Sequence, residues 1–246
     1  MHGQRGVGKS EIVLRYLVDY GHEYDTVQYF DAGSEEILQT QMEGFYDTLC
    51  QRNDTNLRKI IANDQNKCDA VLRWFQQEEN CLIVYDNFDV PNGFDLHRYI
   101  PQASPAHRII VGPNVHTASL SNFDMEIGPM TKEDAVNMFI TLAALSHLSE
   151  VDTIYVSQIV DELDRTPFYI AFGARHLREM QKGPLQILQD IHTEKNNMRL
   201  KSSQLVMGDG SAMWSLAYER IKRQEVSFKL LVIFSFLHGF DIRSLL

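Results

Sequence analysis

The first half of the chain alternates between short apolar runs and longer amphipathic stretches. The apolar runs predict strands at residues 26–30, 81–85, 108–111 and 123–127. The amphipathic stretches predict helices at residues 11–20, 34–51 and 64–77. Strands that alternate with helices in this way are typical of a parallel sheet covered by helices. We therefore predict an α/β fold for residues 1–128.

After Gly128 and Pro129 the apolar residues recur only with helical spacing. They predict helices at residues 132–146, 151–164 and 167–181. Residues 129–190 are therefore predicted to form an all-α subdomain. Residues 191–210 are polar and rich in Asn, Ser and Gly, which predicts a linker or long loop. A last helical segment is predicted within residues 211–246, where it runs into the apolar residues 230–237.

Residues 3–10 carry the pattern G-x-x-x-x-G-K-S/T directly before the first predicted helix. Glycines allow successive backbone N–H groups to face an anion, and the helix that follows presents its positive end to the same anion. In a loop of this kind Lys9 contacts the β- and γ-phosphates and the Ser10 hydroxyl binds Mg²⁺. A glycine turn that only starts a helix is the alternative, and the apolar helix after the loop disfavours it.

The strand at residues 81–85 ends at Asp86, with Asn87 and Asp89 following. A carboxylate at this end of a strand can bind the Mg²⁺ held by the serine of a phosphate-binding loop. Asp86 is therefore the best candidate for the second metal ligand, and Asp89 is a weaker candidate for a catalytic role. A buried strand that ends in a turn-forming Asp-Asn pair is the alternative.

Charge and cysteine content narrow the function classes. The net charge is −10 and no stretch gathers lysine and arginine, so we expect no nucleic-acid partner. The three cysteines are widely spaced and suggest neither a disulfide framework nor a zinc site, which favours the reducing cytoplasm. Residues 230–237 form the longest apolar run, and they are too few to cross a membrane.

These segments, taken in order, resemble a known family. The ordered set is GxxxxGKS, FDAGS, LIVYDNFD, RIIVG, EIGPMTKEDAVNMF, VDELDRTPFYIAFGARHL and SLAYERI…LLVIFSFLHGFDI. It resembles the NB-ARC module of STAND-type signalling ATPases over nearly the whole chain. The resemblance implies a P-loop NTPase sheet at residues 1–128, a helical subdomain at 129–190, a linker at 191–210 and the start of a winged-helix subdomain at 211–246.

The resemblance also implies a function and a site. The function is a switch that binds ADP or ATP with Mg²⁺, forms a homo-oligomer when ATP-bound and signals through attached effector and repeat domains. Ser10 and Asp86 are the implied metal ligands. Pro167 matches the proline of the family's G-L-P-L motif near the adenine, and a proline that only starts a helix explains it equally well. The implied nucleotide-binding residues are Gly3, Gln4, Arg5, Gly6, Val7, Gly8, Lys9, Ser10, Glu11 and Pro167.

Two departures from the family bear on hydrolysis. Gly112, Pro113 and Asn114 stand where the family has an arginine that contacts the γ-phosphate. Asn87 stands where the family often has a second acid, and an amide cannot act as a base. We therefore expect slow hydrolysis or none. An actively hydrolysing ATPase of AAA+ type that uses Asp86 and Asp89, and a scaffold that no longer binds nucleotide, are the alternatives.

A third departure concerns the sheet. In this family the strand before the loop lies between the strands predicted at residues 108–111 and 123–127. Here only two residues precede Gly3, so that strand is absent and its neighbours would lose backbone partners. Residues 211–246 also end within the implied winged-helix subdomain. The sequence thus predicts a fragment of a longer protein, truncated at both ends, or an incomplete gene model.

Overall fold

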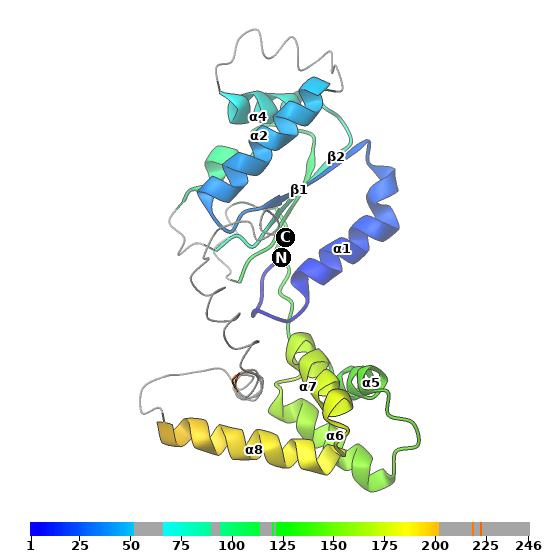
Figure 1. Cartoon of the computed structure of the whole chain (residues 1–246). Coiled ribbons are helices and arrows are strands. Elements are labelled where there is room, and N and C mark those ends of the chain that lie inside the picture. The colour runs from blue at the N-terminus through cyan, green and yellow to red at the C-terminus, as the bar shows by residue number, and fades with distance from the viewer. Residues whose placement is uncertain are drawn as a thin grey trace. The chain divides into compact units, whose positions relative to one another are not determined.

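The computed structural model describes residues 1–51, 66–89, 94–113, 120, 122–201, 218 and 222. The chain divides into two compact units, Met1–Gly128 (unit 1) and Pro129–Leu246 (unit 2) (Figure 1). The segment implied to start a winged-helix subdomain, residues 211–246, lies outside the described residues apart from Tyr218 and Lys222. Asn114 lies outside them as well.

Unit 1 contains a parallel sheet with the strand order β1-β2-β3. The strands are β1 (Thr26–Asp31), β2 (Cys81–Asp86) and β3 (His107–Ile110). In the register of β1 and β2, Asp31 lies opposite Asp86. Because both strands run in the same direction, their carboxyl ends carry these two acids at one edge of the sheet. The mixed α/β class predicted for this part of the chain is confirmed.

His2 forms isolated parallel bridges to Gly112 and to Glu126. The residues before the glycine loop therefore lie between the continuation of β3 and the segment around Glu126, in the position predicted for the strand that precedes the loop. The continuous strand predicted at residues 123–127 is wrong: the described pairing there is one bridge at Glu126, made by the hydrogen bonds of Met125 O and Ile127 N with His2. A strand there would need successive partners, and after His2 the chain turns away at Gly3.

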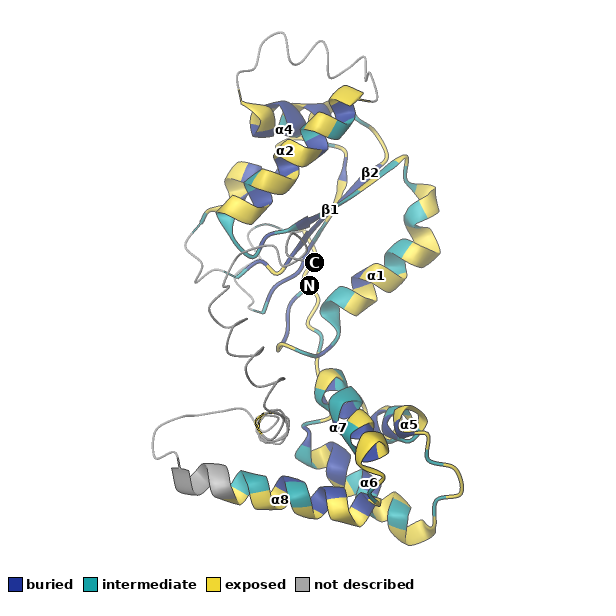
Figure 2. Ribbon diagram, in the orientation of Figure 1, coloured by how far each residue is buried: buried dark blue, intermediate teal, exposed yellow. Residues whose placement is uncertain are grey.

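Helices cover the two faces of this sheet (Figures 1 and 2). Apolar residues of β2 alternate between the faces: Leu82 and Val84 pack with Val13 of helix α1, whereas Ile83 and Tyr85 belong to a second core. That second core contains residues of α2 and α4. The α-helices of unit 1 are α1 (Lys9–Tyr20), α2 (Glu35–Gln51) and α4 (Lys67–Gln77), and the short 3-10 helices are η1 (Gly21–Glu23) and η3 (Leu96–Tyr99). Since side chains of a strand alternate, Asp86 falls on the α1 face with Leu82 and Val84.

Helices are the only regular secondary structure among the described residues of unit 2, as predicted for 129–190. Its helices are α5 (Lys132–Ala143), α6 (Glu150–Glu162), α7 (Pro167–Met180) and α8 (Pro184–Lys201). Thr131 caps α5 by accepting from the Asp134 backbone, and Ser149 forms a capping box with Asp152 at α6. Pro167 is the first residue of α7, which is the position that proline favours in a helix.

The linker predicted at residues 191–210 is wrong as far as Lys201, because α8 continues to that residue. Buried Ile187, Leu188 and Ile191 belong to the unit 2 core, so one side of α8 is apolar. Lys195 Nζ also donates to the Glu162 carboxylate of α6 at 2.8 Å. The helix is therefore held by one apolar side and by ion pairs, which include His192 and Lys195 with Glu162 and Asp190 with Lys182, while most of its residues remain polar. Among the described residues no helix is long and apolar enough to cross a membrane.

Candidate functional site

Glycine sets the shape of the loop formed by residues 3–10, called the glycine loop below. Gly3, Gly6 and Gly8 have positive φ values of 148°, 86° and 97°. Other residues adopt such values only at an energetic cost. Gly8 is the N-cap of α1, and its carbonyl accepts from Ile12 N at 2.9 Å. Since glycine has no side chain to cap a helix, the first N–H groups of α1 and its positive end face the loop.

Lys9 lies across the glycine loop. Its Nζ donates to the carbonyl oxygens of Gly3 at 2.7 Å and of Gln4 at 2.8 Å. Burial lowers the pKa of Lys9, while the nearby carboxylate of Asp86 raises it in part. The ammonium group is therefore bound by two carbonyl oxygens that an incoming anion can replace.

Asp86 is buried beneath the start of α1, with only 4% of its surface exposed. Its Oδ2 accepts from Ser10 Oγ at 2.7 Å and also from the Tyr29 hydroxyl. Its Oδ1 accepts from Asn87 N at 2.8 Å. The sequence-predicted metal ligands Ser10 and Asp86 are thus in direct contact, because β2 directs Asp86 to the α1 face and Ser10 lies in the first turn of α1.

The donor set of this pair suits Mg²⁺, which prefers oxygen ligands and commonly combines one or two carboxylates with phosphate oxygens and water. Ser10 offers a hydroxyl oxygen and Asp86 a carboxylate oxygen. The described residues contain no cluster of three or more His, Cys, Asp or Glu side chains that could hold a metal ion. A cation at Ser10 and Asp86 would therefore need further oxygens from a bound phosphate and from water.

Two further residues beside this pair were missed in the sequence. Asp31 at the end of β1 accepts through Oδ1 from Gly33 N at 2.9 Å and from Asn87 Nδ2 at 3.3 Å. Tyr29, two residues earlier on β1, contacts Asp86. Strand parity places residues 29 and 31 on one face of β1, but the register that sets Asp31 opposite Asp86 is not encoded in the local pattern.

The other predicted site residues have diverse surroundings. Arg5 is exposed and its guanidinium donates to Asp89 Oδ2 at 3.4 Å, so Asp89 lies beside the glycine loop. Val7 is buried, whereas Gln4 is exposed and contributes its carbonyl to Lys9. Glu11 lies exposed in the first turn of α1. Pro167 belongs to unit 2.

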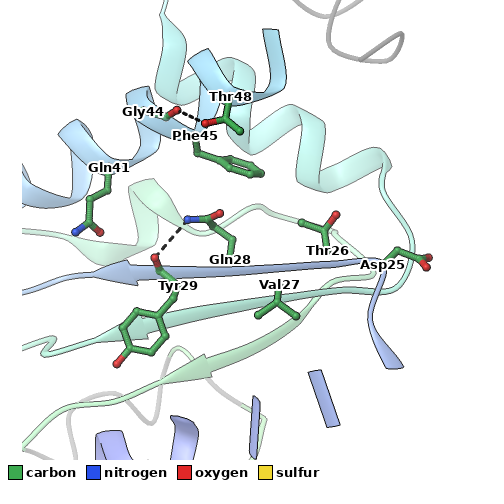
Figure 3. A pocket seen from close by; sticks show the side chains of 9 residues that line it. All are labelled: Asp25, Thr26, Val27, Gln28, Tyr29, Gln41, Gly44, Phe45 and Thr48. Atoms are coloured by element: carbon green, nitrogen blue, oxygen red, sulfur yellow. Dashed lines mark hydrogen bonds between the residues drawn. The ribbon is translucent and has the colours of Figure 1, made fainter. Parts of the chain in front are cut away.

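A groove of about 420 Å³ lies elsewhere on unit 1, between β1 and α2 (Figure 3). Gln28 and Phe45 are among its lining side chains, and Gln28 Nε2 donates to the Tyr29 carbonyl at 3.3 Å. None of the residues that line this groove belongs to the glycine loop. The Tyr29 ring points away from α2, toward the other face of the sheet (Figure 3). The groove is therefore separate from the Ser10–Asp86 contact.

Comparison with known proteins assigns no family: no protein-family model matches the chain, and a search of curated proteins found no match. The chemistry of the site follows from its geometry. The glycine loop, Lys9 and the start of α1 provide hydrogen-bond donors and positive charge for a phosphate group. Ser10 and Asp86 provide two oxygens for a divalent cation next to it.

Proposed function

We propose that unit 1 binds ADP or ATP together with Mg²⁺ and acts as the nucleotide-dependent switch of a larger signalling protein. The observation that carries this proposal is the direct contact of Ser10 with Asp86, at 2.7 Å between residues 76 positions apart, beside a glycine loop that holds a lysine. The glycine loop alone could be a turn that only starts a helix, and Asp86 alone could be the end of a buried strand. The two halves together match what a phosphate-bound Mg²⁺ requires.

Lys9 and the glycine loop supply the phosphate-binding half. The two carbonyl oxygens that now accept from Lys9 Nζ belong to the loop itself, so exchange of these oxygens for phosphate oxygens needs only a side-chain rotation. A charge-assisted bond to phosphate is stronger than one to a neutral carbonyl. Binding therefore favours the exchange.

Ser10 and Asp86 supply the metal-binding half. Mg²⁺ held there would neutralise phosphate charge and fix the phosphate oxygens relative to the loop. Ser10 would bind through its oxygen, so its hydrogen would no longer point at Asp86. Burial of Asp86 keeps this carboxylate shielded from water, which strengthens its attraction for a cation.

The surroundings of Asn87 and Asp89 favour a switch over an active ATPase. Asn87 carries no carboxylate, and its amide donates to Asp31 at 3.3 Å. Asp89 accepts from Arg5, so its charge is compensated by the loop. Gly112, at the position where the family has its γ-phosphate sensor segment, has no side chain and pairs with His2 through its backbone. We therefore propose hydrolysis far slower than about 1 per second, the low end of ordinary enzyme turnover.

The finer parts of this proposal come from the resemblance to NB-ARC modules. They are the preference for adenine nucleotides, the assignment of unit 1 to the P-loop NTPases, ATP-dependent homo-oligomerisation and signalling through attached effector and repeat domains. Pro167 is proposed to lie near the adenine on the same basis.

Titration with fluorescent ADP and ATP, with and without Mg²⁺, tests the proposal. We expect micromolar binding, and we expect Lys9→Ala to weaken it roughly 10- to 100-fold, the usual contribution of a charged hydrogen-bond donor. Asp86→Asn should remove most of the gain in nucleotide affinity that Mg²⁺ provides. Lys67→Ala is the matched control, because Lys67 pairs with Asp47 on the surface of α2 and α4. A folded protein without nucleotide binding, or equal losses in Lys9→Ala and Lys67→Ala, would contradict the proposal.

A further inference from the structure

We propose that Tyr29 is a positioning residue for the Mg²⁺-binding carboxylate of Asp86; this inference rests on the proposed nucleotide function. The Tyr29 hydroxyl donates to Asp86 Oδ2, the same oxygen that accepts from Ser10 Oγ at 2.7 Å. Asn87 N binds the other carboxylate oxygen at 2.8 Å. Three donors from three segments thus fix the orientation of one buried carboxylate.

Packing fixes the Tyr29 ring itself. The ring is partly buried against the core cluster on the α1 face that contains Val13, Leu82 and Val84. In the sheet register Tyr29 lies opposite Val84, two residues before Asp86. Figure 3 shows that the ring leaves β1 on the side away from α2. The hydroxyl is therefore held at the carboxylate by the sheet and by the core beneath α1.

The Tyr29 hydroxyl can donate to Asp86 at neutral pH, because a phenol is ordinarily protonated there. It therefore donates to the carboxylate rather than competing with it as a second anion.

Metal binding would separate the roles of Ser10 and Tyr29. A carboxylate oxygen has two acceptor positions, and in this structure Ser10 and Tyr29 both donate to Oδ2. If Mg²⁺ is bound by Ser10 Oγ and Asp86, the Ser10 hydrogen must turn away and one position on Oδ2 passes to the metal. The bond from Tyr29 can persist in both states. It thereby keeps the carboxylate facing the metal when the bond from Ser10 is lost.

Tyr29→Phe tests this inference, because it keeps the ring and removes only the hydroxyl. We expect Mg²⁺ affinity, measured as the Mg²⁺ dependence of fluorescent-ADP binding, to fall about tenfold, as is usual when a hydrogen-bond partner of a metal ligand is removed. ADP affinity in EDTA should stay unchanged, which a general loss of structure would not allow. Binding of Mn²⁺ with ADP, followed by electron paramagnetic resonance, should show the same tenfold loss.

Tyr16→Phe is the matched control. Tyr16 packs against the same core cluster, and its hydroxyl bonds the Tyr24 hydroxyl at 2.9 Å rather than Asp86. Wild-type Mg²⁺ affinity in Tyr29→Phe, or an equal loss in Tyr16→Phe, would overturn the role of Tyr29 and leave the nucleotide switch standing. A wild-type protein whose ADP binding does not respond to Mg²⁺ would overturn both proposals.

Discussion

Replacement of Gly3 by alanine is the substitution whose effect the structure defines most sharply. Gly3 is buried and has φ of +148°, and an added Cβ would lie 2.1 Å from the carbonyl oxygen of Ile127. Real Cβ atoms essentially never approach another atom closer than 3.0 Å. Because the obstacle is backbone rather than a flexible side chain, the glycine loop or the segment at Ile127 must move.

Two costs follow for Gly3→Ala. A residue with a side chain in this backbone region costs about 1–3 kcal/mol. Movement at Ile127 also breaks its hydrogen bond to the His2 carbonyl, which is 2.8 Å long, and one such bond contributes about 1 kcal/mol. We therefore expect a loss of about 2–4 kcal/mol from the free energy of unfolding, a large part of the 5–15 kcal/mol typical of a domain.

Urea unfolding measures this loss. The sequence contains two tryptophans, so Trp214→Phe leaves Trp74, buried in the core of unit 1, as the fluorescent probe. Gly44→Ala is the control: Gly44 lies inside α2 with no atom within 4 Å of an added Cβ, and alanine there should stabilise by about 0.5–1 kcal/mol. A Gly3→Ala loss below about 1 kcal/mol would refute the steric argument.

Two further predictions concern thiols and acid. In the folded protein at pH 8 one thiol should react quickly with Ellman's reagent, because Cys50 is exposed whereas Cys68 and Cys81 are buried. Burial also raises the pKa of both buried thiols, that of Cys81 to about 11. Three fast thiols would contradict this prediction. The hydrogen bond from Lys195 lowers the pKa of Glu162 below 4.5, so its stabilising contribution is present above the unfolded pKa and is lost as pH falls through the folded value. In Glu162→Gln the melting temperature, followed by circular dichroism, should therefore fall less steeply below pH 4.5 than in the wild type. An unchanged dependence of melting temperature on pH would show that the pair of Glu162 and Lys195 does not cause the fall.

The contact of Ser10 with Asp86 could be predicted because both residues stand at fixed points of regular elements. Ser10 belongs to the first turn of a helix, and Asp86 ends a strand that is buried on both faces. Local patterns set the bounds of these elements, and a parallel sheet brings the carboxyl ends of its strands to one edge. The family resemblance gave the place of the strand before the glycine loop but predicted its absence, whereas His2 forms bridges there to both neighbours.

The contact of Tyr29 with Asp86 could not be predicted from local pattern alone. It depends on the register of β1 against β2, which hydrophobic patterning leaves open when both strands are largely apolar. Helix α8 was missed for a different reason. Its buried core residues end at Ile191, and His192 and Lys195 beyond them bond to Glu162 of α6, contacts between distant residues that polarity along the chain conceals.

The bridges of His2 to Gly112 and Glu126 also set an order of assembly. Ribosomes make the glycine loop long before they make Glu126, yet the residue that anchors the loop has both of its partners in the later segment. Pairing across so long a stretch must first overcome the entropy of loop closure. We infer that during synthesis the glycine loop stays without its final anchor until residue 127 has emerged. The part of unit 1 that is translated first is thus among the last to take its native shape.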